Sequence, residues 1–177
     1  MSKLNCYIRI AVLSAIGFIL INIEFPILPG APFLKLNLSE VPVLLAAFSM
    51  GPIAGAVVAV LQNLLHLLQS KSGGVGEIAN IVISSTYAIT AGLIYLRIKT
   101  RKGACLALLF GSLAMIVAAG FANLFIMLPL YGIPAENRLP LIQTAILPFN
   151  FIKAAVVFLV TWFLYKPLSS LLKGKQK

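Results

Sequence analysis

The chain has 177 residues, of which 60% are hydrophobic and only 10% are charged, and its mean hydropathy is +1.03. Soluble domains carry about 25% charged residues, so the composition excludes an ordinary soluble domain and predicts one integral membrane domain over residues 1–177. The formal net charge of +10 does not indicate nucleic-acid binding, because the basic residues cluster at the ends of apolar stretches, where they orient membrane proteins.

We expect an all-α membrane protein with six transmembrane helices. The apolar spans cover, in chain order, about residues 8–24, 39–50, 53–68, 78–96, 104–130 and 141–165. A helix needs roughly 20 apolar residues to cross a bilayer, so the second span is too short to cross alone. Its shortness predicts a recess that is open to one face of the membrane.

The segment between the first two spans contains three prolines in seven residues, Pro26, Pro29 and Pro32, followed by an alternating run over 33–38. Proline removes backbone donors and fixes φ, so no helix can continue through the prolines. The alternation after them favours an extended segment. Because irregular backbone in a membrane protein needs burial or a cavity, we expect this apolar, stiffened loop to cover a binding site.

The charges predict the orientation of the six spans. Six crossings place both termini, the turn at 51–52 and the loop at 97–103 on the same side. Ten basic residues fall on that side, and three fall on the other (Lys35, Lys71 and Arg138), which also carries all four acidic residues. By the positive-inside rule, both termini are expected to be cytoplasmic and the proline-containing loop extracellular.

Apart from Arg9 at the very start of the first span, Lys153 is the only lysine or arginine inside a span. Pro148 suits the first turn of a helix, so Lys153 is expected roughly one to two turns inside the outer end of that helix. Ionisable residues within the membrane are usually functional, so we favour an ammonium turned toward a ligand over a lysine that snorkels to the interface. Asn150 shares its helix face. Asn123, in the fifth span, either bonds to a neighbouring helix or joins Lys153 in the site.

Other chemistry is poorly supported. His66 has no acidic or thiol partner nearby in the sequence, and a membrane hydrolase would need it to meet Ser84, Ser85 or Ser112. We keep this as a minor alternative. The sequence contains no Walker A motif, so any ATP hydrolysis would belong to a partner. The cysteines Cys6 and Cys105 are expected to stay reduced.

Two patterns of small residues permit close helix packing. Ala11-x-x-x-Ala15 lies in the first span, and Gly51-x-x-x-Gly55-x-x-x-Ala59 begins the third. Either pattern can serve a partner protein or packing within this chain.

A series of motifs follows in order along almost the whole chain. They are Phe25-Pro26, Leu36-x-Leu38-Ser39-Glu40-Val41-Pro42, Gly51-Pro52-Ile53-Ala54-Gly55, Asn63-Leu64-Leu65-His66, Gly76-Glu77-Ile78-Ala79-Asn80, Asn123-Leu124-Phe125, Leu128-Pro129-Leu130-Tyr131-Gly132 and Pro148-Phe149-Asn150-x-x-Lys153. Taken together, these motifs resemble the riboflavin-specific substrate-binding (S) component of energy-coupling factor (ECF) vitamin transporters.

The resemblance implies the six-helix S-component fold, in a bacterial cell membrane, with riboflavin bound as substrate and no cofactor. It implies a transport subunit that is not an enzyme and that works with a transmembrane coupling protein and two ATPases. Substrate contacts are implied at Lys35, Leu36, Asn37, Asn123 and Lys153, and docking of the coupling protein is implied at Ala11 and Ala15.

One position departs from the family pattern, because members often carry Asp where this chain has Asn37. A contact there that depends on charge would therefore differ. The alternatives left open are an S component for another vitamin, such as pantothenate or thiamine, and a purely structural membrane subunit.

Overall fold

The computed structural model describes residues 3–28, 31, 33–70 and 72–172, without the side chains of 166–172. Over these residues the chain folds into six helical rods, as predicted. The first four are α1 (Lys3–Asn22), α2 (Glu40–Met50), α3 (Pro52–Leu67) and α4 (Val75–Arg97). The fifth joins α5 (Arg101–Ala122), η1 (Asn123–Met127) and α6 (Leu128–Leu130), and the sixth joins α7 (Ala135–Leu141), η2 (Ile142–Ile146) and α8 (Leu147–Leu172).

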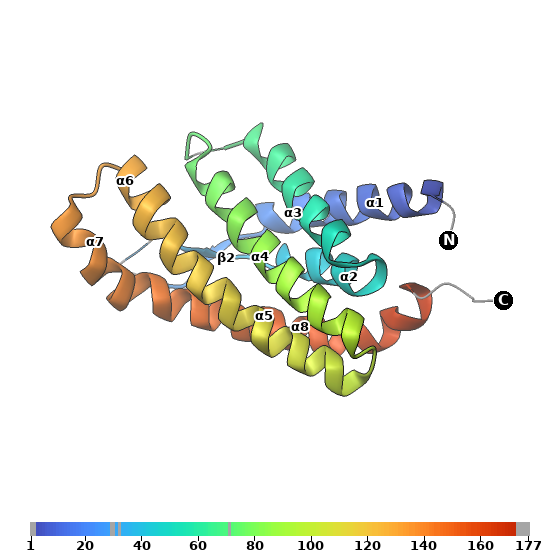
Figure 1. Cartoon of the computed structure of the whole chain (residues 1–177). Coiled ribbons are helices and arrows are strands. Elements are labelled where there is room, and N and C mark those ends of the chain that lie inside the picture. Colours follow the sequence, from blue (N-terminus) through green and yellow to red (C-terminus); the bar gives the residue numbers. More distant parts are fainter. Residues whose placement is uncertain (1–2, 29–30, 32, 71, 173–177) are drawn as a thin grey trace.

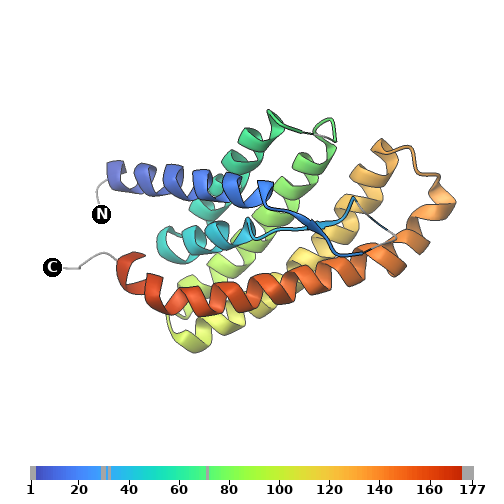
Figure 2. The same ribbon diagram turned by 180° about the vertical axis from the view of Figure 1, so that it is seen from behind.

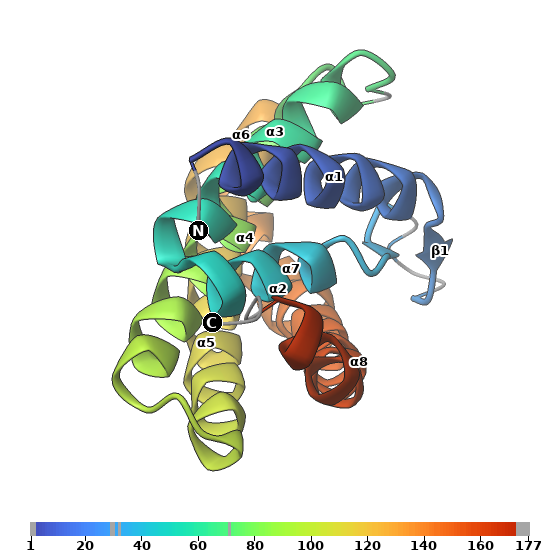
Figure 3. The same cartoon turned by 90° about the vertical axis from the view of Figure 1, so that its right-hand side faces the viewer.

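The rods pack side by side with the start of α1 and the end of α8 at one end of the bundle and α6 and α7 at the other (Figure 1). Figure 3, viewed from the end that carries the termini, shows α1 on one side of the bundle and α5 and α8 on the opposite side, with α2 between them. An even number of passes along the bundle agrees with the predicted placement of both termini on one side. The orientation in the membrane stays a prediction.

Within the described residues, four helical stretches are long and apolar enough to cross a membrane: Lys3–Asn22, Val75–Arg97, Arg101–Leu130 and Ala135–Tyr165. The two apolar helices between them are shorter. At 1.5 Å per residue, the 11 residues of α2 rise only about 16 Å. The short second helix was predicted, and its first residue, Glu40, consequently lies deep inside the bundle, where it is 1% exposed.

The segment between α1 and α2 is extended, as its prolines predicted, although Pro29 and Pro32 lie outside the described residues. Two short strands, β1 (Phe25–Pro26) and β2 (Lys35–Leu36), pair antiparallel, with Phe25 opposite Leu36 and Pro26 opposite Lys35. Figure 2 shows both strands between α1 and α8. This segment therefore closes the gap between the first and last rods at the end away from the termini.

Prolines explain two irregular turns in the last two rods. Pro129 and Pro148 have no backbone N–H, and each follows a π-helical segment, η1 or η2. The amides just before them, Leu128 and Leu147, donate to carbonyls five residues back. A π turn accommodates the lost bond without ending the rod. Pro148 is the second residue of α8 and so lies in the first turn of a helix, as predicted, although the sixth rod itself starts 13 residues earlier, at Ala135.

Small residues allow the central rods to approach closely. A Cβ built at Gly55 would lie 2.8 Å from the Cβ of Ala47 and 3.0 Å from that of Ala88, so α2, α3 and α4 meet at this glycine. The small residues Gly55 and Ala59 are buried, and their spacing serves packing within this chain. In contrast, Ala11 and Ala15 are both exposed and form no such internal contact face.

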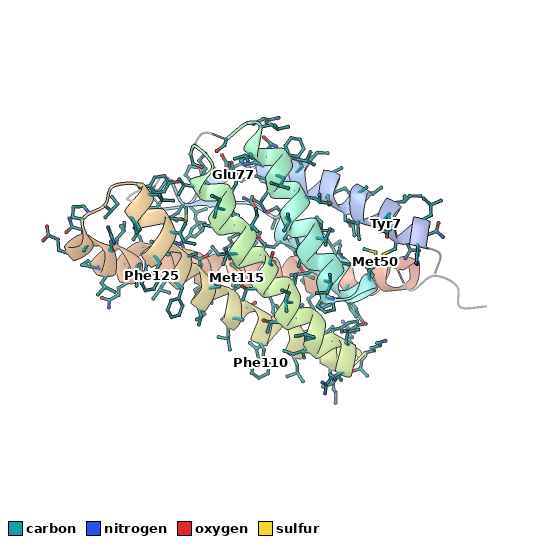
Figure 4. The ribbon with its side chains drawn as sticks, turned by 45° about the horizontal axis from the view of Figure 1, so that its top comes forward. Tyr7, Met50, Glu77, Phe110, Met115 and Phe125 are labelled. Atoms are coloured by element: carbon teal, nitrogen blue, oxygen red, sulfur yellow. The ribbon has the colours of Figure 1, made fainter. Side chains whose placement is uncertain are left out.

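The outer surface of the bundle is apolar, as expected for a chain surrounded by lipid. Figure 4 shows Phe110 and Phe125 pointing away from the rods, and they are 51% and 67% exposed. Met115, between these two on the same rod, is fully buried. Apolar residues thus face both inward and outward, so the polar side chains in the interior stand out as candidates for function.

Candidate functional site

A cavity of about 310 Å³ lies at the end of the bundle away from the termini. Its walls come from the end of α1, the strand segment, the α3–α4 connection, η1 and α8. The polar lining residues are Asn22, Glu24, Lys35, Asn37, His66, Gln69, Ser72, Glu77, Asn80, Asn123, Asn150 and Lys153, and the others are Ile21, Phe33, Leu34, Gly76, Ile83, Met127, Tyr131 and Phe149. We call this space the site cavity.

A second cavity, of about 420 Å³, adjoins the first. It is lined by Phe33, Lys35, Ser72, Leu128, Tyr131, Ile133 and Leu141. Four of these residues, Phe33, Lys35, Ser72 and Tyr131, also line the site cavity. Ligand sites usually measure roughly 300–1,000 Å³, so the two spaces together have room for a vitamin-sized molecule. We call the second space the outer chamber.

The structure brings together four of the five residues implied as substrate contacts. Lys35, Asn37, Asn123 and Lys153 all line the site cavity. Leu36 does not, because successive side chains of a strand point to opposite sides, and it packs against an apolar cluster that includes Leu34 and Leu128. A contact from the Leu36 side chain would need the strand segment to move, so its role stays a prediction.

Lys153 is buried in the centre of the bundle, 5% exposed, and its ammonium lies 2.6 Å from Oε1 of Glu40. From the sequence, Lys153 was identified within a span, but its counter-charge was not. An isolated buried charge is very costly, so buried charges are almost always paired. Since an ammonium has three donors, the bond to Glu40 leaves two for a ligand. Lys153 lines the site cavity, whereas Glu40 does not and contacts the ammonium from within the bundle.

Local structure at the start of α2 delivers Glu40 to this position. Oδ1 of Asn37 accepts hydrogen bonds from the backbone N–H (3.2 Å) and the hydroxyl (2.8 Å) of Ser39, which fixes the turn that leads into the helix. Glu40 then begins α2, where a carboxylate is favoured by the helix dipole. Ser84 of α4 also donates to Oε1 of Glu40, at 3.4 Å. The carboxylate therefore links α2, α4 and α8.

Two asparagines present acceptors near Lys153. The amide nitrogen of Asn123 donates to the carbonyl of Ala119, and that of Asn150 donates to the carbonyl of Ile146, each at 2.8 Å. These bonds fix which way the side chains point. Oδ1 of Asn123 is buried and has no partner among the described residues. An unpaired buried oxygen is costly, so this atom is suited to accept a hydrogen bond from a ligand.

His66 is not solitary either, contrary to the sequence analysis. Its Nδ1 lies 2.8 Å from Oε1 of Glu77, which lies in the first turn of α4. The hydroxyls of Ser70 and Ser72 donate to Oε2 of the same carboxylate. Figure 4 shows Glu77 at the connection between α3 and α4. Both serines bond to the carboxylate, so the group closes this connection. Two of the serines considered for a hydrolase bond elsewhere, Ser84 to Glu40 and Ser112 to the hydroxyl of Tyr87.

A third ion pair lies at the boundary between the two cavities. Lys35 of β2 bonds to Glu24, the second residue after the end of α1. The antiparallel pairing of Pro26 with Lys35 brings the two side chains to the same place. Both are partly exposed, at 33% and 26% of their side-chain surfaces, which places the pair at the mouth of the site.

Sequence reasoning missed Glu40, Glu24, Glu77 and Tyr131 as parts or supports of the site. A signal for Glu40 was present. Lys153 was recognised as buried, a buried ammonium needs a counter-charge, and the chain offers only four acidic residues. No pattern in the sequence indicated Tyr131, because its position depends on how the fifth rod ends.

Comparison with known proteins agrees with this architecture. The family described as "ECF transporter, substrate-specific component" matches residues 6–165. The chain belongs to this family. It is therefore a membrane transport subunit and not an enzyme, and the family works with ECF-type partner proteins in general.

Relatives extend over nearly the whole chain. The riboflavin transporter RibU of Staphylococcus aureus (strain TCH60) is 39% identical over 172 residues, which cover 94% of this chain and 91% of that protein. The riboflavin transporter FmnP of Bacillus subtilis (strain 168) is 31% identical, covering 89% and 88%. A solved structure described as the S component of a bacterial ECF transporter superposes with a TM-score of 0.85 at 37% identity, covering 97% of this chain and 99% of that one.

The ion pair between Glu40 and Lys153 generates a first testable prediction. Glu40→Ala should lower the free energy of unfolding by about 3–5 kcal/mol, because it leaves a buried ammonium unpaired. Adding Lys153→Met should recover part of this loss, since the double variant contains no buried charge. Thermal unfolding of the detergent-solubilised proteins measures both effects.

Glu136→Ala is the matched control. Glu136 is an exposed acid of α7 outside both cavities, and its loss should change stability by less than about 0.5 kcal/mol. Strictly additive losses from Glu40→Ala and Lys153→Met would show that the two charges do not support each other.

Proposed function

We propose that this chain binds riboflavin as the S component of an ECF vitamin transporter, with residues 1–177 acting as one substrate-binding unit. The observation that carries the proposal is the polar group formed by Asn123, Asn150 and Lys153 at the wall of a vitamin-sized cavity. The identity to riboflavin transporters over nearly the full chain supports the choice of vitamin.

The chemistry of the cavity suits a flavin. Isoalloxazine is a flat apolar ring system whose one edge alternates carbonyl acceptors with an N–H donor. The amide oxygens of Asn123 and Asn150 can accept from that donor, and the free N–H groups of Lys153 can donate to the carbonyls. Phe33, Ile83, Met127 and Phe149 offer apolar walls for the ring body. Most ligand sites combine apolar walls and a few fixed polar groups in this way.

Partner binding is proposed for the exposed face of α1. The partners are a transmembrane coupling protein and two ATPases, which supply the energy that this chain cannot obtain itself. Ala11 and Ala15 are four residues apart and both exposed, so a helix of the coupling protein can approach the α1 backbone closely. In this orientation both termini are cytoplasmic and the strand segment covers the site from outside.

Binding can be tested with a panel of vitamins. Riboflavin at about 100 times its dissociation constant should stabilise the purified protein by about 2.7 kcal/mol, which appears as a higher melting temperature. Pantothenate and thiamine should leave the melting temperature unchanged. Protein purified from cells supplied with riboflavin should also show a flavin absorption spectrum. Stabilisation by another vitamin and not by riboflavin would contradict the proposal.

Substitution of Ala11 tests the partner surface. Ala11→Trp places a bulky side chain on the exposed face of α1, where the coupling protein would need close contact. This variant should bind riboflavin as the parent does but should no longer co-purify with the coupling protein. Val12→Trp, at a neighbouring exposed position about 100° around the helix, is the matched control and should assemble. Normal assembly of the Ala11→Trp variant would refute this role.

A further inference from the structure

Three pairs of a basic side chain and a carboxylate surround the site cavity: Lys35 with Glu24, His66 with Glu77, and Lys153 with Glu40. Lys35, His66 and Lys153 all line the cavity, and each faces its own carboxylate. The described residues of the site therefore present no unpaired cation. A ligand with a net negative charge would meet no free cation among these residues.

A phosphorylated flavin would make a different demand. A phosphate monoester carries a charge of about −1.5 to −2 at pH 7, and proteins usually bind it with Arg or Lys side chains that are free to pair with it. We propose that the paired charges make this site selective for unphosphorylated flavin, and that Glu24 is the specificity-determining residue because it occupies Lys35. This inference rests on the proposed function and names the substrate class of the same site.

The position of the Glu24–Lys35 pair singles it out among the three. The Glu40–Lys153 pair is buried, with exposures of 1% and 5%, and supports the bundle. Glu77 is held by two serine hydroxyls in addition to His66. Lys35, in contrast, lines both the site cavity and the outer chamber, so it is the ammonium that a chain extending from the site toward the mouth would reach.

The outer chamber supports the same conclusion. Its described lining consists of apolar and aromatic residues together with Ser72 and Lys35, so Lys35 is its one ionisable group apart from the phenol of Tyr131. A phosphate at the end of the flavin's polar chain would depend on Lys35 there. Glu24 pairs with that ammonium, and its carboxylate would repel a phosphate brought close to the pair. Removal of the Glu24 charge should therefore free Lys35 to pair with a phosphate at the mouth of the site.

The test compares riboflavin with riboflavin 5′-phosphate by fluorescence titration of the purified protein. The parent should bind riboflavin at least tenfold more tightly than the phosphate ester. Glu24→Gln should improve the relative affinity for the ester by about tenfold, or ~1.4 kcal/mol, and the gain should shrink at high salt because the mouth is exposed to solvent. Glu24→Gln/Lys35→Gln should lose the gain, since no free ammonium remains.

Controls keep the outcomes distinct. Glu136→Gln removes an exposed acid outside both cavities and should leave the affinity ratio unchanged. If Glu24→Gln does not fold, Lys35→Gln serves instead, because an unpaired Glu24 should weaken binding of the ester more than binding of riboflavin. Equal affinities in the parent, or equal changes for both ligands in these variants, would overturn the inference. A parent protein that binds neither flavin would overturn the proposed function itself.

Discussion

The ion pair between Lys153 and Glu40 is the interaction on which the site depends. A bare ammonium in the middle of an apolar bundle would be too costly to keep, so Lys153 can face a cavity only because a carboxylate lies 2.6 Å behind it. That carboxylate reaches the interior because α2 is short and begins at Glu40. The short helix α2 therefore supplies the counter-charge for Lys153, the lysine buried in the middle of the bundle.

The irregular parts of the fold all gather around this pair. The strand segment leads directly into α2, and its last residues include Asn37, which fixes the turn before Glu40. Asn123 is the first residue of η1, and Asn150 lies one turn after the end of η2; π turns are often found at functional sites. In the regular parts of the rods, small residues such as Gly55 allow close packing. The site cavity and the outer chamber both lie at the end of the bundle away from the termini, next to the irregular segments.

Much of this architecture could be predicted from the sequence. The hydropathy pattern predicted the six helices, and the prolines predicted the extended segment between the first two. The short second span predicted a recess. Lys153 and Asn123 were identified because polar residues within apolar spans are rare. The partners of the polar residues could not be predicted, since Glu40 lies 113 positions before Lys153 and the two meet only through packing of α2 against α8. Pro148 was correctly expected in the first turn of a helix, but the start of the sixth rod at Ala135 was not predicted, because a π turn lets the rod continue past the proline.

The central claim is that the Lys153 ammonium binds riboflavin. It is tested most directly by comparing the riboflavin affinities of Glu40→Gln and Glu40→Gln/Lys153→Met, because both variants lack the counter-charge. In the Glu40→Gln background, adding Lys153→Met should weaken riboflavin binding at least tenfold, or ~1.4 kcal/mol, because only the second variant lacks the ammonium that donates to the flavin. Comparison within this background separates ligand contact from the cost of an unpaired buried carboxylate. Equal riboflavin affinities for the two variants would show that Lys153 supports the bundle and does not bind the vitamin.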